Sequence, residues 1–553
     1  MSRLLLLFLT LNFLLIAPLW WRFGEISSYL LAWEALIIAP LMLLLPVGPT
    51  RRVVAVGVVS WVMLATVVNL GTAATQMAFA RPLNLYLDVP LLRSIYHLLV
   101  GNVGQLLAVC AMLAGGLVVR HHTDFIAPAV APVAYSVKRL PGMVALTLLV
   151  IATSSAVLEL GGIRLVDSAR LPMVNTTRFQ WQQVTDTHAA RLAFTAQLES
   201  APMEARSLPG LAGRNVLLTF IESYGISALE NPRYSDVLLP TLAEMQQRLG
   251  EHDLHVVSGM LASPIRGGQS WLAHATTLSG RWIDNQLWYR LMLDSDHTTL
   301  IDDFRATGQR TLSVMPAITL AWPEGEAYGF DEIAAAKDIA YAGPALNWVT
   351  MPDQFTLDYT QRYLLGEAPV FAQLALISSH APWTPILPVL DNWSSIGDGR
   401  IFAPWESAGD PPEVLWQDIE RIRDHYAWSV DYAVKVTGRW AERVVDDNTL
   451  MIVLGDHQAA PLITGDDASA AVPVHIISGD PELLMPFIKR GFVPGTLPTL
   501  EEASSAPRMS QLRHWLQTDF GELKVGLGTD SAAWIASEKR EFSDSRTTTR
   551  TQQ

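Results

Sequence analysis

Residues 215 to 225 read Asn-Val-Leu-Leu-Thr-Phe-Ile-Glu-Ser-Tyr-Gly. The first seven form an unbroken aliphatic and β-branched run, which is typical of a strand buried on both faces of a parallel sheet. Glu222 follows this run immediately, so the sequence predicts a carboxylate at the carboxyl end of the strand. Ligands of open α/β sheets bind at that end of the strands, and Glu222 is therefore a candidate functional residue.

Similar short apolar runs recur along the rest of the chain. They lie at 254–257, 310–314, 370–377, 449–454 and 472–477, and helix-like stretches separate them at 239–249, 299–307, 356–365, 416–445 and 509–520. Strands that alternate with helices predict an α/β domain with a mostly parallel sheet flanked by helices. We assign this domain to residues 214–536, a linker and connecting helix to 163–213, and a disordered tail to 537–553.

Residues 1–162 have a different texture, because Leu, Val, Ala and Ile dominate them. A helix needs about 20 apolar residues to span a bilayer. Five stretches meet that length, at 4–21, 28–47, 53–72, 96–119 and 143–162. The first could instead be a cleaved signal peptide, but no small-residue cleavage site follows it. The sequence predicts an N-terminal bundle of five transmembrane helices.

The distribution of Lys and Arg predicts the orientation of this bundle. With the N-terminus inside the cell, six Lys and Arg fall in the cytoplasmic segments and three on the opposite side. Positive charge is retained on the cytoplasmic side, so everything after residue 162 is expected outside. We therefore predict a multi-pass protein of the inner (plasma) membrane whose α/β domain lies on the periplasmic or extracellular side. Glu34 lies in the second predicted span, where it is either functional or simply directed into the bundle.

Charge and cysteine content exclude some classes of protein. The formal net charge of −14 argues against nucleic acid as a partner. The single cysteine, Cys110, falls in the fourth predicted span, so the outer domain is expected to have neither disulfides nor thiolate metal ligands. The sequence does not indicate an oligomeric state.

Two more predicted strands end in polar side chains. Asp456 and His457 follow the run at 449–454, and His380 follows the run at 370–377. One polar residue after a strand means little, because loops are polar anyway, but coincidence at three strand ends points to a site. Glu, Asp and His side chains together suit Zn²⁺ or Mn²⁺.

A nucleophile for such a site is expected on a loop that opens a helix. Gly267-Gly268-Gln269-Ser270 has this form, since glycines allow close approach to a phosphate and helix N-termini favour anions. An ordinary helix N-cap is the alternative interpretation of Ser270. Coordination of a metal ion would turn its hydroxyl into a nucleophile.

In order and spacing, these motifs resemble the sulfatase-like branch of the alkaline phosphatase superfamily. Within it the chain looks most like lipoteichoic acid synthase and the membrane phosphoglycerol and phosphoethanolamine transferases. The resemblance implies that Glu222, Ser270, Asp456 and His457 hold one divalent ion, Zn or Mn, and that Ser270 is the covalent nucleophile. It also implies that His380 binds substrate or protonates the leaving group.

Other segments support the resemblance or depart from it. Residues 328–331 are similar to the family's Gly-Phe-Asp segment, and Asp431 matches a recurring Asp for which a structural role is expected. The family's transferases usually carry Thr as nucleophile and many have Lys before it, whereas Ser270 and Gln269 stand here.

Two substrate-binding residues follow from the resemblance. Arg266 is a possible phosphate partner in place of the missing Lys, although an ordinary surface Arg is the alternative. Trp322 is the second, but Pro323 and Glu324 stand where an Arg is expected nearby. Sulfatases require Cys or Ser at the position where this chain has Ala262. Sulfate-ester hydrolysis is therefore disfavoured.

The predicted activity is transfer of a phosphoglycerol or phosphoethanolamine head group. The donor would be a membrane phospholipid and the acceptor an envelope glycan or a lipid-linked group. Two alternatives stay open at this point: a membrane-tethered phosphatase, phosphodiesterase or sulfatase-like hydrolase, and a non-catalytic membrane scaffold or sensor.

Overall fold

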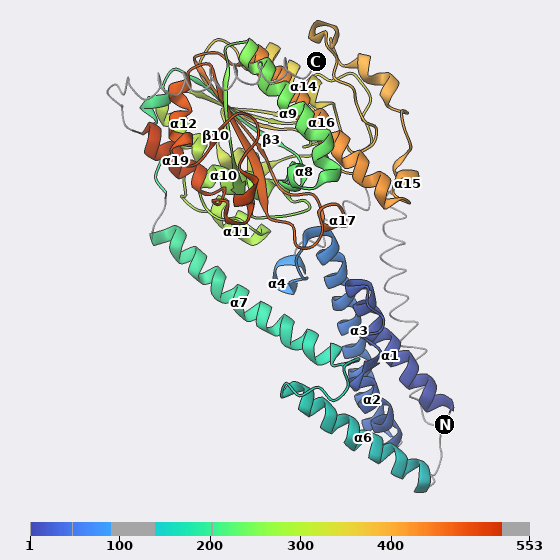
Figure 1. Ribbon diagram of the computed structural model, residues 1–553. Helices are drawn as coiled ribbons and strands as arrows, with labels where there is room; N and C mark the ends of the chain where they lie inside the picture. Colours follow the sequence, from blue (N-terminus) through green and yellow to red (C-terminus); the bar gives the residue numbers. More distant parts are fainter. Residues whose placement is uncertain (1, 47, 90–138, 201–202, 522–553) are drawn as a thin grey trace. The chain divides into compact units, whose positions relative to one another are not determined.

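The computed structural model describes residues 2–46, 48–89, 139–200 and 203–521 (Figure 1). The chain divides into two compact units, Met1–Ala193 and Phe194–Gln553. The fourth predicted span at 96–119, with Cys110, lies outside the described residues, and so does the predicted tail at 537–553.

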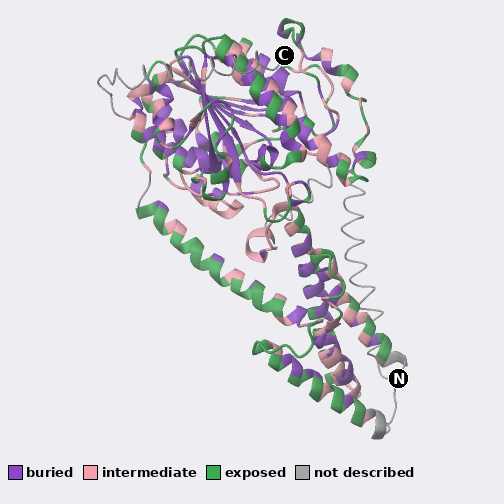
Figure 2. Cartoon of the chain, in the orientation of Figure 1, coloured by how far each residue is buried: buried purple, intermediate pink, exposed green. Residues whose placement is uncertain are grey.

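The first unit is helical. Its helices are α1 (Ser2–Phe23), α2 (Trp33–Leu44), α3 (Pro49–Phe79), α4 (Leu85–Asp88), α6 (Arg139–Leu160) and most of α7 (Pro172–Ser200). Within the described residues, three stretches are long and apolar enough to cross a membrane: Leu5–Phe23, Pro49–Phe79 and Gly142–Leu160. They overlap the first, third and fifth predicted spans. Large apolar side chains on these helices are exposed, as expected of lipid-facing surfaces (Figure 2).

The second predicted span, at 28–47, was too long. Helix α2 has 12 residues, which at 1.5 Å per residue is about 18 Å against about 30 Å of hydrocarbon. The preceding residues form β1 (Leu31–Ala32), which pairs in parallel with β2 (Ala169–Arg170). Beyond the helix, Leu45 has extended backbone and Pro46 follows it. Residues before a proline disfavour helix, so hydrophobicity alone overestimated this segment.

The environment of Glu34 accounts for its burial in α2. Its Oε1 atom accepts a hydrogen bond of 3.2 Å from the backbone N–H of Val174, in the first turn of α7. Carboxylates stabilise helix N-termini, where backbone N–H groups lack partners. The structure therefore supports the interpretation in which Glu34 is directed into the helical unit.

The second unit contains an eight-stranded mixed sheet in the order β10-β4-β9-β8-β3-β7-β5-β6. The strands are β3 (Asn215–Ile221), β4 (His255–Ala262), β5 (Arg310–Met315), β6 (Glu332–Ala335), β7 (Val370–Ala375), β8 (Thr449–Gly455), β9 (Ala471–Ser478) and β10 (Val493–Pro494). The five strands from β8 to β6 are parallel to one another, whereas β9 is antiparallel to both β8 and β4. The α/β class was predicted, but the antiparallel edge was not.

Helices cover both faces of this sheet (Figure 1). On one face lie α9 (Pro232–Glu251) and α16 (Ile419–Val444), and on the other α10 (Ser270–Ser279), α12 (Leu300–Thr307) and α19 (Gln511–Phe520). Strand β3 supplies both cores: Leu217 and Ile221 pack into one, and Val216, Leu218 and Phe220 into the other. This alternation explains why the β3 sequence has no polar side. Glu222 follows a central strand that is buried from Val216 to Ile221, and Figure 2 shows the centre of the sheet as buried.

Candidate metal centre

The site is built where β3 and β8 end side by side. These strands are parallel neighbours, and Ile221 is in register with Gly455. Glu222 and Asp456 therefore emerge next to each other. The backbone N–H of Ser223, which has a positive φ of 57°, donates a hydrogen bond of 2.8 Å to Oδ1 of Asp456. The left-handed backbone conformation of Ser223 turns the chain out of β3, and its hydrogen bond to Asp456 connects the ends of β3 and β8.

Three of the predicted metal ligands come together here. Glu222, Asp456 and His457 are buried, and each offers a ligand atom within 4.8 Å of the others. The Nε2 atom of His457 lies 3.3 Å from Oε1 of Glu222 and 3.7 Å from Oδ2 of Asp456. On the other side of the ring, Nδ1 lies 2.8 Å from the carbonyl oxygen of Gln458. Donation from Nδ1–H to that carbonyl leaves Nε2 directed at the two carboxylates, as metal-binding histidines require.

Ser270 reaches the same cluster from the loop after β4. Its Oγ atom donates a hydrogen bond of 2.8 Å to Oε2 of Glu222 and lies 3.2 Å from Nε2 of His457. Gly267, Gly268 and Gln269 all have positive φ, which lets the loop turn sharply into α10. Because its hydroxyl is directed at the cluster, Ser270 does not serve as the ordinary N-cap that was the alternative.

The charges of this cluster favour a cation. Burial acts to raise the pKa of Glu222, but the neighbouring His457 outweighs it and holds that pKa below its ordinary value. Burial, and then the nearby Glu222, raise the pKa of Asp456 to about 8. Burial lowers the pKa of His457, but Asp456 and Glu222 outweigh it and raise that pKa to about 9. Two buried carboxylates thus lie against one imidazole, 3.3 and 3.7 Å from its Nε2 atom. Two carboxylates and one imidazole together form a set of oxygen and nitrogen donors that suits a divalent ion.

His380 lies at the same edge of the sheet, in the turn after β7, which pairs with β3. Its Nδ1 atom lies 2.6 Å from the carbonyl oxygen of Ala381, and its ring stacks on that of Trp348 with centroids 6.2 Å apart. Its charge is one of the influences that lower the pKa of Glu222. The preceding residue, Ser379, donates a hydrogen bond of 2.6 Å from its hydroxyl to the backbone carbonyl of Glu222.

Arg266, a predicted phosphate partner, makes backbone contacts instead. Its two terminal nitrogens donate hydrogen bonds to the carbonyl oxygens of Gly465 and Asp466, at 2.9 and 3.0 Å. The next residue, Gly267, donates from its N–H to the carbonyl of Gln458 over 2.8 Å. Arg266 thereby ties the Ser270 loop to the segment that follows His457.

The other residues that the sequence singled out contact the core of the domain or neighbouring side chains. Trp322, at the start of α13 (Pro323–Tyr328), packs against the core that contains Phe220 and over Gly325. Asp331 accepts hydrogen bonds from both the N–H and the hydroxyl of Thr311. Asp431 on α16 accepts a hydrogen bond from the Thr241 hydroxyl, which fits the structural role expected for it.

Sequence reasoning missed three residues near the site. Asp353 and Trp348 both belong to the region before β7, which carries no motif of its own. His274, one helical turn after Ser270, is buried with no hydrogen bond to either ring nitrogen, and burial lowers its pKa to about 4. Its spacing of four residues from Ser270 was the one available signal, because residues i and i+4 share a helix face.

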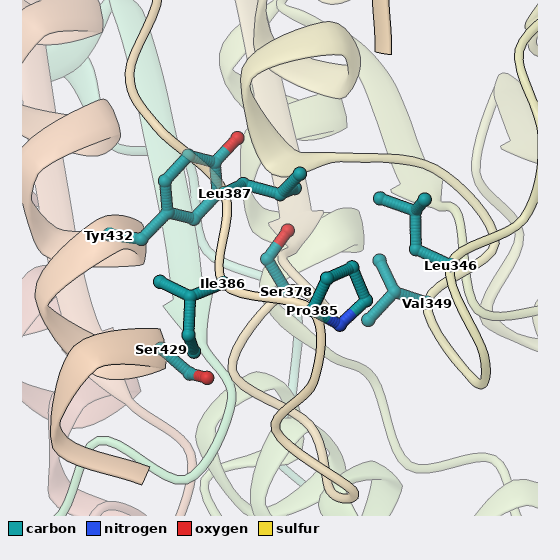
Figure 3. Close-up of a pocket in the computed structure, with 8 residues that line it drawn as sticks. All are labelled: Leu346, Val349, Ser378, Pro385, Ile386, Leu387, Ser429 and Tyr432. Carbon is teal, nitrogen blue, oxygen red and sulfur yellow. The ribbon is translucent and has the colours of Figure 1, made fainter. Parts of the chain in front are cut away.

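A small pocket lies beside the turn that carries His380 (Figure 3). Figure 3 shows Ser378 among the lining residues, with Ser429 and Tyr432 on one side and Leu346 and Val349 on the other. None of the predicted metal ligands lines it. The pocket is therefore distinct from the metal centre.

Comparison with known proteins gives similar solved structures at low identity. No family model and no curated protein matches the chain. The integral membrane lipooligosaccharide phosphoethanolamine transferase EptA from Neisseria meningitidis is 12% identical, with 94% of each chain covered and a TM-score of 0.45. The lipoteichoic acid synthase LtaP from Listeria monocytogenes is 13% identical, with 49% of this chain and 66% of that chain covered and a TM-score of 0.34.

A third structure is the C-terminal periplasmic domain of EptC from Escherichia coli, in complex with Zn. It is 14% identical, with 58% of this chain and 87% of that chain covered and a TM-score of 0.38. The similar structures are thus of the kinds that the sequence motifs resemble. At such identities the function of this chain has to be derived from its own residues.

Proposed function

We propose that this chain is a membrane-anchored, metal-dependent transferase. It would move a phosphoglycerol or phosphoethanolamine head group from a membrane phospholipid to an envelope glycan or lipid acceptor, through a covalent intermediate on Ser270. The observation that carries the proposal is the hydrogen bonding of the Ser270 hydroxyl to Glu222 and its closeness to His457, inside a buried cluster.

Glu222, Asp456, His457 and Ser270 would hold the ion, with three oxygen donors and one nitrogen. Such a set suits Zn²⁺ or Mn²⁺. When bound, the ion would lower the pKa of the serine hydroxyl and neutralise charge on the phosphate.

In the first half-reaction, the Oγ atom of Ser270 forms a bond to phosphorus while the bond from phosphorus to the diacylglycerol oxygen breaks. The hydroxyl proton leaves to solvent, because the low pKa of Glu222 makes that carboxylate a poor base, and the hydrogen bond to Oε2 of Glu222 orients the hydroxyl. Nε2 of a protonated His380 supplies the proton to the departing oxygen, because Nδ1 is engaged with Ala381. Diacylglycerol is the first product.

In the second half-reaction, a hydroxyl of the acceptor attacks phosphorus and gives its proton to Nε2 of His380. The bond between phosphorus and Oγ breaks, and Ser270 regains its proton from solvent. Both side chains then return to their starting states. Water as the acceptor would make the same site a phosphodiesterase.

The membrane anchor supports a lipid donor. Three long apolar helices in the described part of the chain suit an inner-membrane protein, with the catalytic unit on the periplasmic or extracellular side. A donor that stays in its bilayer would spare the enzyme from extracting a lipid.

The test is a lipid-turnover assay with the full chain in proteoliposomes. Phosphatidylglycerol and phosphatidylethanolamine with labelled head groups are supplied with Mn²⁺ or Zn²⁺, with and without envelope glycan. We expect diacylglycerol release by the wild type but not by Ser270→Ala, and label in the glycan. Label found only in water-soluble products would replace the transferase with a hydrolase, and no release from either lipid with either metal would contradict both.

A further inference from the structure

Asp353 is a fully buried carboxylate that the proposed reaction does not use. It is the first residue of α14 (Asp353–Tyr359), and none of its surface is exposed. Its Oδ1 atom accepts two backbone hydrogen bonds, from Ile377 at 2.8 Å and from Ser378 at 2.9 Å. Its own N–H donates to the hydroxyl of Ser378 over 2.9 Å. Three hydrogen bonds thus join the start of α14 to the residues that follow β7.

The residues that Asp353 holds lead directly into the site. Ser379 comes next, and its hydroxyl donates to the backbone carbonyl of Glu222. His380 follows, and its N–H donates over 3.0 Å to the carbonyl of Ile377, which closes a tight turn. A displacement of Ile377 and Ser378 would therefore move both the backbone of a metal ligand and the imidazole of His380.

From this geometry we propose that Asp353 is a positioning residue, which fixes the turn carrying Ser379 and His380 through its Oδ1 atom. The inference rests on the proposed function of the same site. Buried N–H groups without an acceptor are unfavourable, so loss of Oδ1 would drive the turn to rearrange. Misplacement of a catalytic group by about 1 Å can reduce a rate by about 100-fold.

The negative charge of Asp353 is not needed for this role. Its Oδ2 atom has no hydrogen-bond partner, and burial raises the pKa of the group to about 6. Two titratable groups that interact with it are Glu222, at the end of β3, and Tyr432, on α16. Neither carries a positive charge that would favour the ionised form. An amide with the same acceptor oxygen should therefore serve nearly as well.

Two substitutions separate the acceptor from the charge. Asp353→Asn keeps an oxygen at the Oδ1 position, whereas Asp353→Leu has a similar shape and no acceptor. We expect the Asn variant to retain about one third or more of kcat for diacylglycerol release, and the Leu variant to lose about 10- to 100-fold with little change in KM. Equal losses in the two variants would overturn the role of Oδ1, and so would a Leu variant with wild-type kcat.

The matched control is Asp358→Leu, on the same helix. Asp358 is also buried, but it pairs with Arg362 at 2.5 Å instead of with the turn. Its replacement should leave kcat within about threefold of the wild type. A loss as large as that in Asp353→Leu would mean that any change in α14 impairs the enzyme, which contradicts a specific role of Asp353.

A double-mutant cycle tests whether Asp353 acts through His380. In a His380→Ala background the Leu substitution should cost clearly less than it does in the wild type, because one of the two groups that it misplaces is already gone. A full multiplicative loss in that background would overturn the proposal. Ser378→Ala, which removes one of the three hydrogen bonds and leaves Asp353 in place, serves as a milder variant if Asp353→Leu does not fold.

Hydrogen exchange distinguishes failure of this proposal from failure of the proposed function. Exchange of the full chain in micelles is measured over peptides that span 376–383. We expect faster exchange there in Asp353→Leu, and wild-type exchange in Asp353→Asn and Asp358→Leu, whether or not the protein turns over any lipid. Unchanged exchange in the Leu variant would overturn the proposal even if lipid turnover is confirmed.

Discussion

The hydroxyl of Ser270 donates a hydrogen bond of 2.8 Å to Oε2 of Glu222, across 48 residues of sequence. Glu222 ends the central strand β3, and Ser270 begins α10 after a loop of three residues with positive φ. Because both elements pack into the same core, this contact is fixed by the fold. The proposed nucleophile and a proposed metal ligand are thus held in contact by two elements that share one core.

Replacement of Ser270 tests this pair. Ser270→Ala should reduce kcat for diacylglycerol release by about 1,000-fold or more, because no covalent intermediate can form. Ser270→Thr keeps the hydroxyl and should retain measurable turnover. Both are measured by product release under saturating lipid. An Ala variant with more than about a tenth of wild-type kcat would contradict the role of the serine.

Metal binding should release protons. Burial and Glu222 raise the pKa of Asp456, and the two carboxylates raise that of His457, so the cluster should hold more protons near neutral pH without the ion than with it. The ion competes with these protons, so its affinity should rise as the pH is raised from 6 to 8. Calorimetric titration in buffers of different ionisation enthalpy measures the number released. An affinity that is independent of pH would contradict this arrangement.

Substitution of Arg266 distinguishes two roles of this residue: anchoring of the Ser270 loop and binding of the substrate. Its guanidinium binds the carbonyls of Gly465 and Asp466, so Arg266→Met should loosen the Ser270 loop and lower kcat by about 10-fold. KM for the lipid should stay within about twofold. The control is Arg400→Met, because Arg400 is an exposed residue paired with Asp398. A large rise in KM with unchanged kcat would show instead that Arg266 binds the phosphate, as the sequence suggested.

Acid should destabilise the second unit through its buried imidazoles. Burial lowers the pKa of His475 to about 4, while its ring nitrogens contact the hydroxyls of Tyr224 and Ser258. The unfolded chain therefore binds an extra proton between pH 6.5 and 4, and stability falls as the pH decreases through that window, by about 1.4 kcal/mol per pH unit for each such group.

His475→Gln should make that fall shallower, because an amide cannot take up the proton. The melting temperature of the full chain in micelles, measured from pH 7 to pH 4, follows the change. His514→Gln, at an exposed position on α19, should keep the wild-type slope. The same slope in both variants would contradict the contribution of His475.

Much of the site was predictable because it lies at the ends of strands. The apolar runs of β3 and β8 indicate strands buried on both faces, and a parallel pair brings its carboxyl ends together. The positions of Glu222, Asp456 and His457 relative to one another follow from that rule alone. Ser270 needed the glycine-rich loop as a further signal.

Other features depend on tertiary structure that local patterns do not encode. Strand β9 is as apolar as its neighbours, so nothing in its composition indicated that it runs antiparallel. The length of α2 is limited by the pairing of Leu31 and Ala32 with a segment more than 130 residues away. Asp353 and Arg266 act on backbone groups of distant loops, and such contacts leave no spacing pattern in the sequence.

The most direct test of this account is the metal content of the purified full chain. Wild type and Asp456→Asn are loaded with Zn²⁺ or Mn²⁺ at pH 8, dialysed, and analysed for bound metal per chain. We expect about one ion per wild-type chain and a large loss in the variant, since three protein ligands plus the serine define a single site. A wild-type protein that retains no ion, or a variant that retains as much as the wild type, would contradict the metal centre and the chemistry built on it.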